Sequence, residues 1–317
     1  MNILEIKDLK VHYKTSKGEL KAVDGVSFEL KKGESLGLVG ESGCGKTSVA
    51  MAIMKLLPTN ARIISGQILF KGEDLVPMTE KQMQNIRSKG IALIFQAAMN
   101  ALNPVYRVEN QIIEAICAHK SISKKEAKAR VEELYHLVGL DYSFAKNYPH
   151  EYSGGMKQRA IIAMALSCNP EIIIADEPTT ALDVIVQDQI IREIVEIQHK
   201  LEMSLIYISH DIGVIAETCN YVGVMYAGQI VEYAQTKSLF KTPLHPYTQG
   251  LLASYPSISG EKKKLFSIPA EPINSLSSEH SCRFYNRCLQ GKDICSKEEP
   301  VYREVKDGHW VLCHLFS

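Results

Sequence analysis

The chain has 317 residues, which allows one large domain with an appendage or two domains. Lysine and arginine together number 36, as do aspartate and glutamate, so the net charge gives no reason to expect a nucleic-acid or anionic-membrane partner. No apolar stretch approaches the roughly 18 residues that span a bilayer, and the first residues lack the basic and apolar regions of a signal peptide. We therefore expect a soluble protein of the cytosol that binds no nucleic acid.

Short apolar or alternating runs predict strands along much of the chain. In order they cover residues 4–13, 26–30, 35–39, 67–70, 91–95, 172–175, 205–209 and 221–226. Helices are predicted among them at residues 47–57, 123–138 and 156–167. This alternation of strands and helices indicates a layered α/β core.

Two segments depart from the α/β pattern. Residues 103–152 predict helices alone, so we expect a helical insertion at about residues 97–158, in which Gly139 ends one helix. From about residue 241 the chain becomes rich in Pro, Ser and Cys and poor in apolar residues. We expect a core domain at residues 1–240 and a loop-rich C-terminal extension at residues 241–317, too poor in apolar residues for a core of its own.

Residues 40–47 read Gly-Glu-Ser-Gly-Cys-Gly-Lys-Thr, a complete match to G-x-x-x-x-G-K-[ST] between a predicted strand and a predicted helix. The backbone N–H groups of such a loop and the N-terminus of the following helix bind phosphate oxygens. We expect Lys46 to reach the β- and γ-phosphates of ATP and the Thr47 hydroxyl to bind Mg²⁺. The other residues expected to line this site are Gly40, Ser42, Gly43, Cys44, Gly45 and Ser48.

Polar side chains follow three of the other predicted strands. Residues 172–177 read Ile-Ile-Ile-Ala-Asp-Glu, so Asp176 is expected to hold Mg²⁺ and Glu177 to act as general base towards the attacking water. Gln96 ends the strand at 91–95 and could contact Mg²⁺ or that water. His210 follows the strand at 205–209, at the carboxyl-end edge where open α/β sheets bind ligands, and is a third catalytic candidate.

Residues 153–158 read Ser-Gly-Gly-Met-Lys-Gln, and Ala-Leu-Asp follows at 181–183. Together with the phosphate loop, Gln96, residues 172–177 and His210, these motifs resemble the nucleotide-binding subunits of ATP-binding-cassette transporters over about residues 3–240. The resemblance implies an ATPase with a phosphate-loop NTPase core, an antiparallel β subdomain and an inserted helical subdomain. It also implies a second ATPase subunit, bound head to tail, so that each ATP lies between the phosphate loop of one subunit and residues 153–158 of the other.

The resemblance assigns further residues to this shared site. Ser153, Gly154 and Gly155 open a predicted helix, where a hydroxyl and bare N–H groups can bind an anion. Gln158 lies in the same motif, and Asp183 is implied to cross the subunit interface. Tyr13, at the end of the first predicted strand, matches the aromatic residue that stacks on adenine in this family.

The extension resembles that of oligopeptide/dipeptide importer ATPase subunits, through residues 243–248 (Pro-Leu-His-Pro-Tyr-Thr), 282–288 (Cys-Arg-Phe-Tyr-Asn-Arg-Cys) and 309–314 (His-Trp-Val-Leu-Cys-His). This implies a peripheral subunit at the cytoplasmic face of the membrane that powers peptide import. Its implied partners are two transmembrane permease subunits, docked on the helical insertion, and indirectly an extracellular solute-binding protein. Import of nickel or another small solute is an alternative, as is a soluble cassette ATPase of nucleic-acid repair or translation.

Four cysteines, Cys282, Cys288, Cys295 and Cys313, fall within the extension and are separated by five, six and seventeen residues. Zinc sites usually contain a C-x₂₋₄-C pair, so these longer gaps favour a [4Fe-4S] cluster over zinc, as does the resemblance. The substitute ligands considered are His280, His309 and His314. We expect a stabilising role for this site rather than redox sensing, and we expect the phosphate loop to lie in a separate core.

Overall fold

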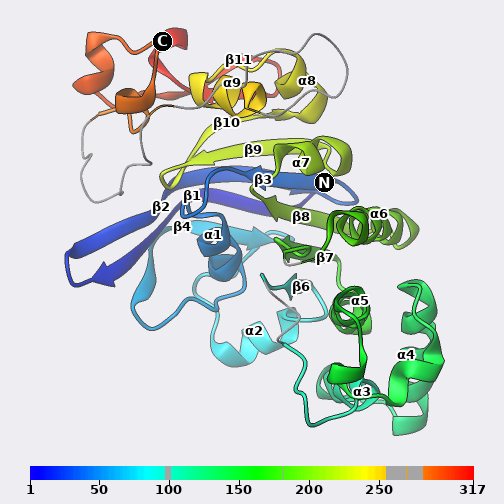
Figure 1. The fold of residues 1–317 in the computed structure, drawn as a ribbon. Coiled ribbons are helices and arrows are strands. Elements are labelled where there is room, and N and C mark those ends of the chain that lie inside the picture. Colours follow the sequence, from blue (N-terminus) through cyan, green and yellow to red (C-terminus); the bar gives the residue numbers. More distant parts are fainter. Residues whose placement is uncertain (97–100, 181, 255–268, 270–280) are drawn as a thin grey trace. The chain divides into compact units, whose positions relative to one another are not determined.

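The computed structural model describes residues 1–96, 101–180, 182–254, 269 and 281–317 (Figure 1). The fold is mixed α/β, as the sequence predicts, and the chain forms two compact units. The helical unit contains Met1, Lys31–Glu34 and Pro77–Tyr207. The phosphate-loop unit contains Asn2–Leu30, Ser35–Val76 and Ile208–Ser317. No helix among the described residues is long and apolar enough to cross a membrane.

A four-stranded antiparallel sheet forms one part of the phosphate-loop unit. Its strand order is β2 (Gly18–Lys31), β1 (Asn2–Thr15), β4 (Ala61–Phe70) and β5 (Glu73–Asp74). Strands β1 and β4 run antiparallel, with Leu4 opposite Phe70. Buried side chains alternate with exposed ones over parts of β1 and β2, which is why the alternating pattern of the sequence locates both strands. This sheet is the antiparallel β subdomain that the resemblance implies.

The second sheet of this unit carries the phosphate loop. Its strands follow the order β11 (Tyr302–Lys306), β12 (His309–Leu312), β10 (Gln229–Gln235), β9 (Tyr221–Tyr226) and β3 (Ser35–Val39). Strand β3 is buried throughout and pairs parallel to β9. Helix α7 (Ile212–Thr218) packs against β3, where a Cβ on Gly37 would lie 2.3 Å from the Ile215 side chain. The loop that follows β3 leads into α1 (Lys46–Ile53), which ends earlier than predicted because Lys55 adopts a left-handed backbone conformation.

The C-terminal extension contains more regular structure than the sequence predicts. The hairpin of β11 and β12 was not predicted, and β12 extends the sheet by pairing with β10, where Val311 lies opposite Glu232. Helix α8 (Thr236–Lys241) leads into this region, whose described helices are α9 (Pro246–Ala253) and the short 3₁₀ helices η5 (Tyr285–Arg287), η6 (Asp293–Ser296) and η7 (His314–Phe316). Leu244, Val311 and Cys313 form a small buried cluster with Leu315 and Phe316 packed against it.

A buried carboxylate fastens the extension to β10. Glu232 is fully buried and accepts hydrogen bonds from the backbone N–H groups of Leu244 and His245, at 2.8 and 2.9 Å. Its Oε1 also lies 2.7 Å from Nε2 of His309 on β12. Burial lowers the pKa of the neighbouring His245 to about 4, so that imidazole is neutral and accepts the N–H of Tyr247. Glu232 therefore ties the start of α9 and the last strand to one point.

The helical unit contains β6 (Ile91–Ile94), β7 (Ile172–Asp176) and most of β8 (Ser204–Ser209), with β7 in the middle and parallel to β6. The regular elements within residues 103–152 are helices, as the sequence predicts, and residues 97–100, where the insertion was expected to start, lie outside the described residues. Its second helix begins where Ser123 and Glu126 form a capping box, and Gly139 follows it in the left-handed conformation. The helices of the unit are α2 (Glu80–Ile86), α3 (Val108–His119), α4 (Lys124–Leu137), α5 (Gly154–Ala165), α6 (Val184–Lys200) and the short η2 (Tyr142–Lys146), η3 (Pro149–Glu151) and η4 (Leu166–Cys168).

Replacing Glu232 with alanine should lower the free energy of unfolding by about 3 kcal/mol, because two buried N–H groups and His309 lose their acceptor. Urea denaturation followed by circular dichroism measures this change. The control is Arg303→Ala on exposed β11, which should change the stability by less than about 0.5 kcal/mol. Equal stability of the two variants would contradict the anchoring role of Glu232.

Candidate functional site

The phosphate loop is confined by backbone atoms on two sides. A Cβ on Gly40 would lie 2.1 Å from the carbonyl oxygen of Met225, and one on Gly45 would lie 2.2 Å from that of Ala22. Gly45 also has a φ of 107°, in the left-handed region, and precedes the first residue of α1. Only glycine fits these two positions, and the resulting turn leaves the first N–H groups of α1 available to an anion.

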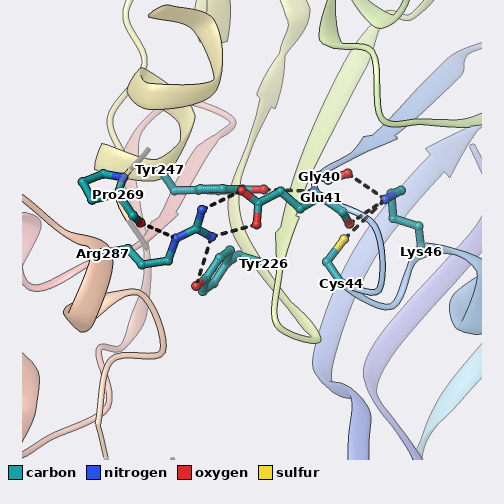
Figure 2. Close-up of polar contacts among 8 residues, drawn as sticks. All are labelled: Gly40, Glu41, Cys44, Lys46, Tyr226, Tyr247, Pro269 and Arg287. Atoms are coloured by element: carbon teal, nitrogen blue, oxygen red, sulfur yellow. Dashed lines mark hydrogen bonds and ion pairs between the residues drawn. The ribbon is translucent and has the colours of Figure 1, made fainter. Parts of the chain in front are cut away.

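Lys46 is folded back into this loop. Its side chain is buried, and Nζ donates to the carbonyl oxygens of Gly40 and Glu41 at 2.7 and 3.0 Å and lies 3.5 Å from Sγ of Cys44 (Figure 2). Burial raises the pKa of the Cys44 thiol, which keeps it neutral beside the ammonium. The ammonium thus lies inside the loop that the motif assigns to phosphate, while Thr47 is exposed at its rim.

The remaining predicted residues of the loop lie around it. Ser42 and Gly43 are exposed at its tip. Ser48, in the first turn of α1, lies with Oγ 3.2 Å from the hydroxyl of Tyr13, which is half-buried on β1. This contact brings the predicted adenine-stacking residue to the same helix end as the phosphate loop. His210 is an exposed residue of the same unit and follows β8, as predicted.

In the helical unit, the predicted carboxylates end β7. Asp176 is buried, and Glu177 has a φ of 45°, a left-handed conformation that costs a residue with a side chain about 1 to 3 kcal/mol. The Glu177 Oε2 accepts a hydrogen bond from Nε2 of Gln96 at 2.9 Å and another from the hydroxyl of Thr180 at 3.3 Å. The structure therefore brings together Gln96 and Glu177, which are 81 residues apart, and adds Thr180, which the sequence analysis missed.

Residues 153–158 open α5, and their side chains divide between surface and interior. Ser153 is exposed and caps the helix, with its hydroxyl accepting the N–H of Met156 at 3.3 Å. Gly154 is half-buried. A Cβ on Gly155 would lie 2.9 Å from Val186, so this glycine also permits close packing of α5 against α6. Gln158, the last residue of the motif, is buried.

The start of α6 exposes apolar side chains next to a predicted interface residue. Asp183 is exposed and caps α6 by accepting the N–H of Val186 at 3.0 Å. Val184 and Ile185 then leave 80% and 73% of their surface exposed. Neither residue was predicted to be exposed, because apolar residues are common in a helical segment. Ala181, the first residue of that motif, lies outside the described residues.

The four cysteines of the extension lie close together. The N–H of Cys282 donates to the carbonyl oxygen of Cys295 at 2.9 Å. Burial, together with the nearby thiols of Cys295, Cys313 and Cys288, raises the pKa of the Cys282 thiol to about 12. Nevertheless, among the residues that the structure describes, no group of three or more His, Cys, Asp or Glu side chains has an arrangement that could hold a metal ion. The donor set thus fits a four-thiolate site chemically, but its arrangement gives no support for a bound cluster or zinc.

Two of the three histidines considered as substitute ligands have other partners. His309 contacts the Glu232 carboxylate, and Nε2 of His314 lies 3.0 Å from the carbonyl oxygen of Glu298. His280 lies outside the described residues. Each of these contacts occupies one ring nitrogen, Nε2, of its histidine.

The expectation of a separate core for the phosphate loop was wrong. Residues 35–76 and 208–317 belong to the same compact unit, because the extension contacts the loop directly. The Arg287 guanidinium forms two hydrogen bonds with the carboxylate of Glu41 (Figure 2). Such a pair joins residues 246 positions apart, which no local sequence pattern indicates.

Known protein families match both the predicted cassette and the predicted C-terminal extension. The family model described as ABC transporter matches residues 23–180, and that described as oligopeptide/dipeptide transporter, C-terminal region, matches residues 231–295. The chain is 47% identical to the oligopeptide transport ATP-binding protein OppD of Bacillus subtilis, covering 99% of this chain and 88% of that one. It is 40% identical to the dipeptide transport ATP-binding protein DppD of Escherichia coli, covering 99% and 97%.

Solved structures give the same result for the fold. The dimeric ABC transporter cassette MJ0796 matches with a TM-score of 0.66 and 26% identity, over 74% of this chain and 98% of that one. The protein cbiO1 of Clostridium perfringens, part of an ABC transporter complex, matches with a TM-score of 0.66 and 27% identity, over 76% and 91%. With a complete phosphate loop, a carboxylate pair at the end of β7 and relatives that match nearly end to end, the chain belongs to the ABC transporter ATP-binding proteins that carry the oligopeptide/dipeptide transporter C-terminal region.

Proposed function

We propose that this protein is the ATP-hydrolysing subunit of a membrane importer for di- and oligopeptides, bound peripherally at the cytoplasmic face of the membrane. The observation that carries the catalytic part is the Glu177 carboxylate, held by Gln96 directly after Asp176 at the end of β7. The relatives named for oligopeptide and dipeptide transport support the choice of substrate. We propose two permease subunits and a second ATPase subunit as direct partners. An extracellular solute-binding protein is an indirect partner.

Hydrolysis in this proposal depends on groups that the chain holds in place. Glu177 takes a proton from the attacking water, and the amide of Gln96 fixes the carboxylate that does so. Lys46 exchanges the carbonyl oxygens of Gly40 and Glu41 for phosphate oxygens when ATP binds. Thr47, Asp176 and Gln96 would hold Mg²⁺, which prefers oxygen ligands of this kind and would offset phosphate charge. His210 is the third residue to which we assign a catalytic role.

The second ATPase subunit would complete the site from residues that face solvent here. Ser153 and Asp183 are exposed at the starts of α5 and α6, and Val184 and Ile185 add exposed apolar surface beside them. Exposed apolar side chains next to a polar, anion-binding helix end are typical of a protein interface. We therefore infer a head-to-tail dimer, with Tyr13 against adenine and residues 153–155 against the partner's phosphates.

Proteoliposomes that contain this chain, its permease subunits and its second ATPase test the transport assignment. Peptide-loaded solute-binding protein, placed on the extracellular side of the permease, should raise the ATPase rate of these proteoliposomes. The binding protein without peptide should not. Stimulation by Ni²⁺-loaded binding protein instead would assign another solute to the same machine. An ATPase rate of the isolated chain that matches the full assembly would contradict the transporter role.

Replacing Glu177 with glutamine should reduce turnover by roughly 10²- to 10⁴-fold and retain ATP binding, because the amide keeps the shape but cannot accept a proton. Phosphate release in the assembled transporter measures the rate, and nucleotide binding is measured separately. The matched control is Glu196→Gln on the exposed part of α6, which should keep normal turnover. Near-normal hydrolysis by the Glu177 variant would remove Glu177 from the role of base.

Lys46→Ala and Ser153→Arg should fail at different steps. The first removes the cation of the phosphate loop and should abolish ATP binding to the isolated chain. The second should leave that binding intact and block ATP-dependent dimerisation, because Ser153 serves the partner's nucleotide. Equilibrium binding and analytical ultracentrifugation separate the two effects. Loss of binding in both isolated variants would contradict the shared site.

We also propose that Cys282, Cys288, Cys295 and Cys313 hold a [4Fe-4S] cluster, with zinc as the alternative. Support comes from the gathering of four thiols within one short region and from the all-sulfur donor set. A chain purified without oxygen should then be brown and contain roughly four irons. Cys295→Ser should remove the colour and speed proteolysis after residue 281. One zinc and no iron in a colourless preparation would contradict the cluster.

A further inference from the structure

Glu41, the second residue of the phosphate loop, is held by two side chains from the C-terminal extension. The Arg287 guanidinium contacts both carboxylate oxygens of Glu41, at 2.7 and 2.8 Å. The backbone N–H of Glu41 donates to the hydroxyl of Tyr247 on α9 at 3.0 Å (Figure 2). Both the side chain and the peptide of one loop residue are therefore fixed by residues more than two hundred positions away.

The arginine is itself held on several sides. It is buried, and Nε donates to the carbonyl oxygen of Pro269 at 2.9 Å. One terminal nitrogen lies 3.4 Å from the hydroxyl of Tyr226, and the guanidinium carbon lies 5.6 Å from the centre of that ring. The paired hydrogen bonds to Glu41 raise the pKa of Arg287. A fork of this kind, with its donors already oriented, fixes a carboxylate in both position and direction.

Glu41 connects Arg287 and Tyr247 to Lys46, the residue assigned to bind phosphate. Its carbonyl oxygen accepts a hydrogen bond from Lys46 Nζ, while its N–H and its carboxylate belong to Tyr247 and Arg287. The next loop residues, Ser42 and Gly43, are exposed. With Glu41 released, this tip would have to be ordered each time a nucleotide binds, and the affinity would fall by that cost.

The pair also has an electrostatic consequence. Glu41 is an anionic residue within a loop that must receive the anionic phosphates of ATP. The Arg287 guanidinium offsets that charge at hydrogen-bond distance, and Glu41 is only partly exposed to screening water. Removing Arg287 alone would leave an uncompensated carboxylate on a residue of the phosphate loop.

We infer that Arg287 and Tyr247 are positioning residues of the ATP site, which hold Glu41 and offset its charge so that the phosphate loop is ready to bind. The extension is then part of the nucleotide site and not only a stabilising appendage. This inference rests on the proposed assignment of residues 40–47 to phosphate. It concerns residues outside that motif and outside the four cysteines.

The test is a double-mutant cycle on the full chain, with binding of ATP and of ADP as the readout. Arg287→Ala should raise the Kd for ATP by roughly 10- to 100-fold, the loss expected for a charge-assisted pair. Glu41→Gln should have a smaller effect, and the double variant should bind ATP more tightly than Arg287→Ala alone, because the uncompensated charge is gone. Rescue of this kind is not expected of a purely structural arginine. A double variant no better than Arg287→Ala would overturn the charge-offsetting role.

Arg283 provides the matched control. It is an equally buried arginine of the same extension, but it pairs with the Asp24 carboxylate and the carbonyl oxygen of Ala227, which lie outside the phosphate loop. Arg283→Ala should lower the Tm by a comparable amount and change the Kd for ATP by less than about twofold. If both arginine variants weakened ATP binding in proportion to their loss of Tm, the positioning role would be wrong.

Two further variants keep the outcome decisive. Should Arg287→Ala fail to fold, Arg287→Lys, which keeps the charge but loses the fork, and Tyr247→Phe, which removes the acceptor of the Glu41 N–H, should each raise the Kd by about 3- to 10-fold. Unchanged affinity in both would overturn the inference. Lys46→Ala in the same assay distinguishes failure of this inference from failure of the proposed function. If Lys46→Ala binds ATP normally, the assignment of residues 40–47 to phosphate is wrong, and the positioning role of Arg287 and Tyr247 is wrong for that reason.

Discussion

Space around the phosphate-loop backbone is the constraint on which the rest of this unit depends. The loop runs so close to the carbonyl oxygens of Ala22 and Met225 that a single methylene at Gly45 or Gly40 could not be accommodated. Those carbonyls belong to β2 and β9, so both sheets must be in place before the loop can adopt its shape. A third support, from Arg287 and Tyr247, acts on Glu41 and comes from the far end of the chain.

The helical unit meets a different requirement, which is to aim a carboxylate. The left-handed backbone at Glu177 is unfavourable for a residue with a side chain, and the surrounding contacts must compensate. Gln96 and Thr180 both bind the same carboxylate oxygen and so oppose its rotation. Strain held at a strand end, with the side chain fixed from two directions, is consistent with a group whose direction matters to catalysis.

The sequence located most elements of both units because their signals are local. Strand β3 and helix α4 each follow from the residues of one short segment of the chain. The hairpin of β11 and β12 was missed because its strands are short and β11 carries mostly charged, exposed side chains. The burial of Gln158 and the pairing of Arg287 with Glu41 were missed for another reason, since both depend on which distant segments meet in the folded chain.

The two carboxylates that receive the extension, Glu232 and Glu41, bear on how the protein can be divided. A chain cut at residue 240 would keep both acids and lose the groups that bind them: Leu244, His245 and His309 for the first, Tyr247 and Arg287 for the second. The fragment would leave the Glu232 carboxylate on β10, now the edge strand of the sheet, without its partners. It would leave the Glu41 carboxylate in the phosphate loop without its partners. Truncation at the apparent end of the cassette would therefore yield a defective enzyme, and a shortened natural relative would need an apolar or neutral residue at both positions.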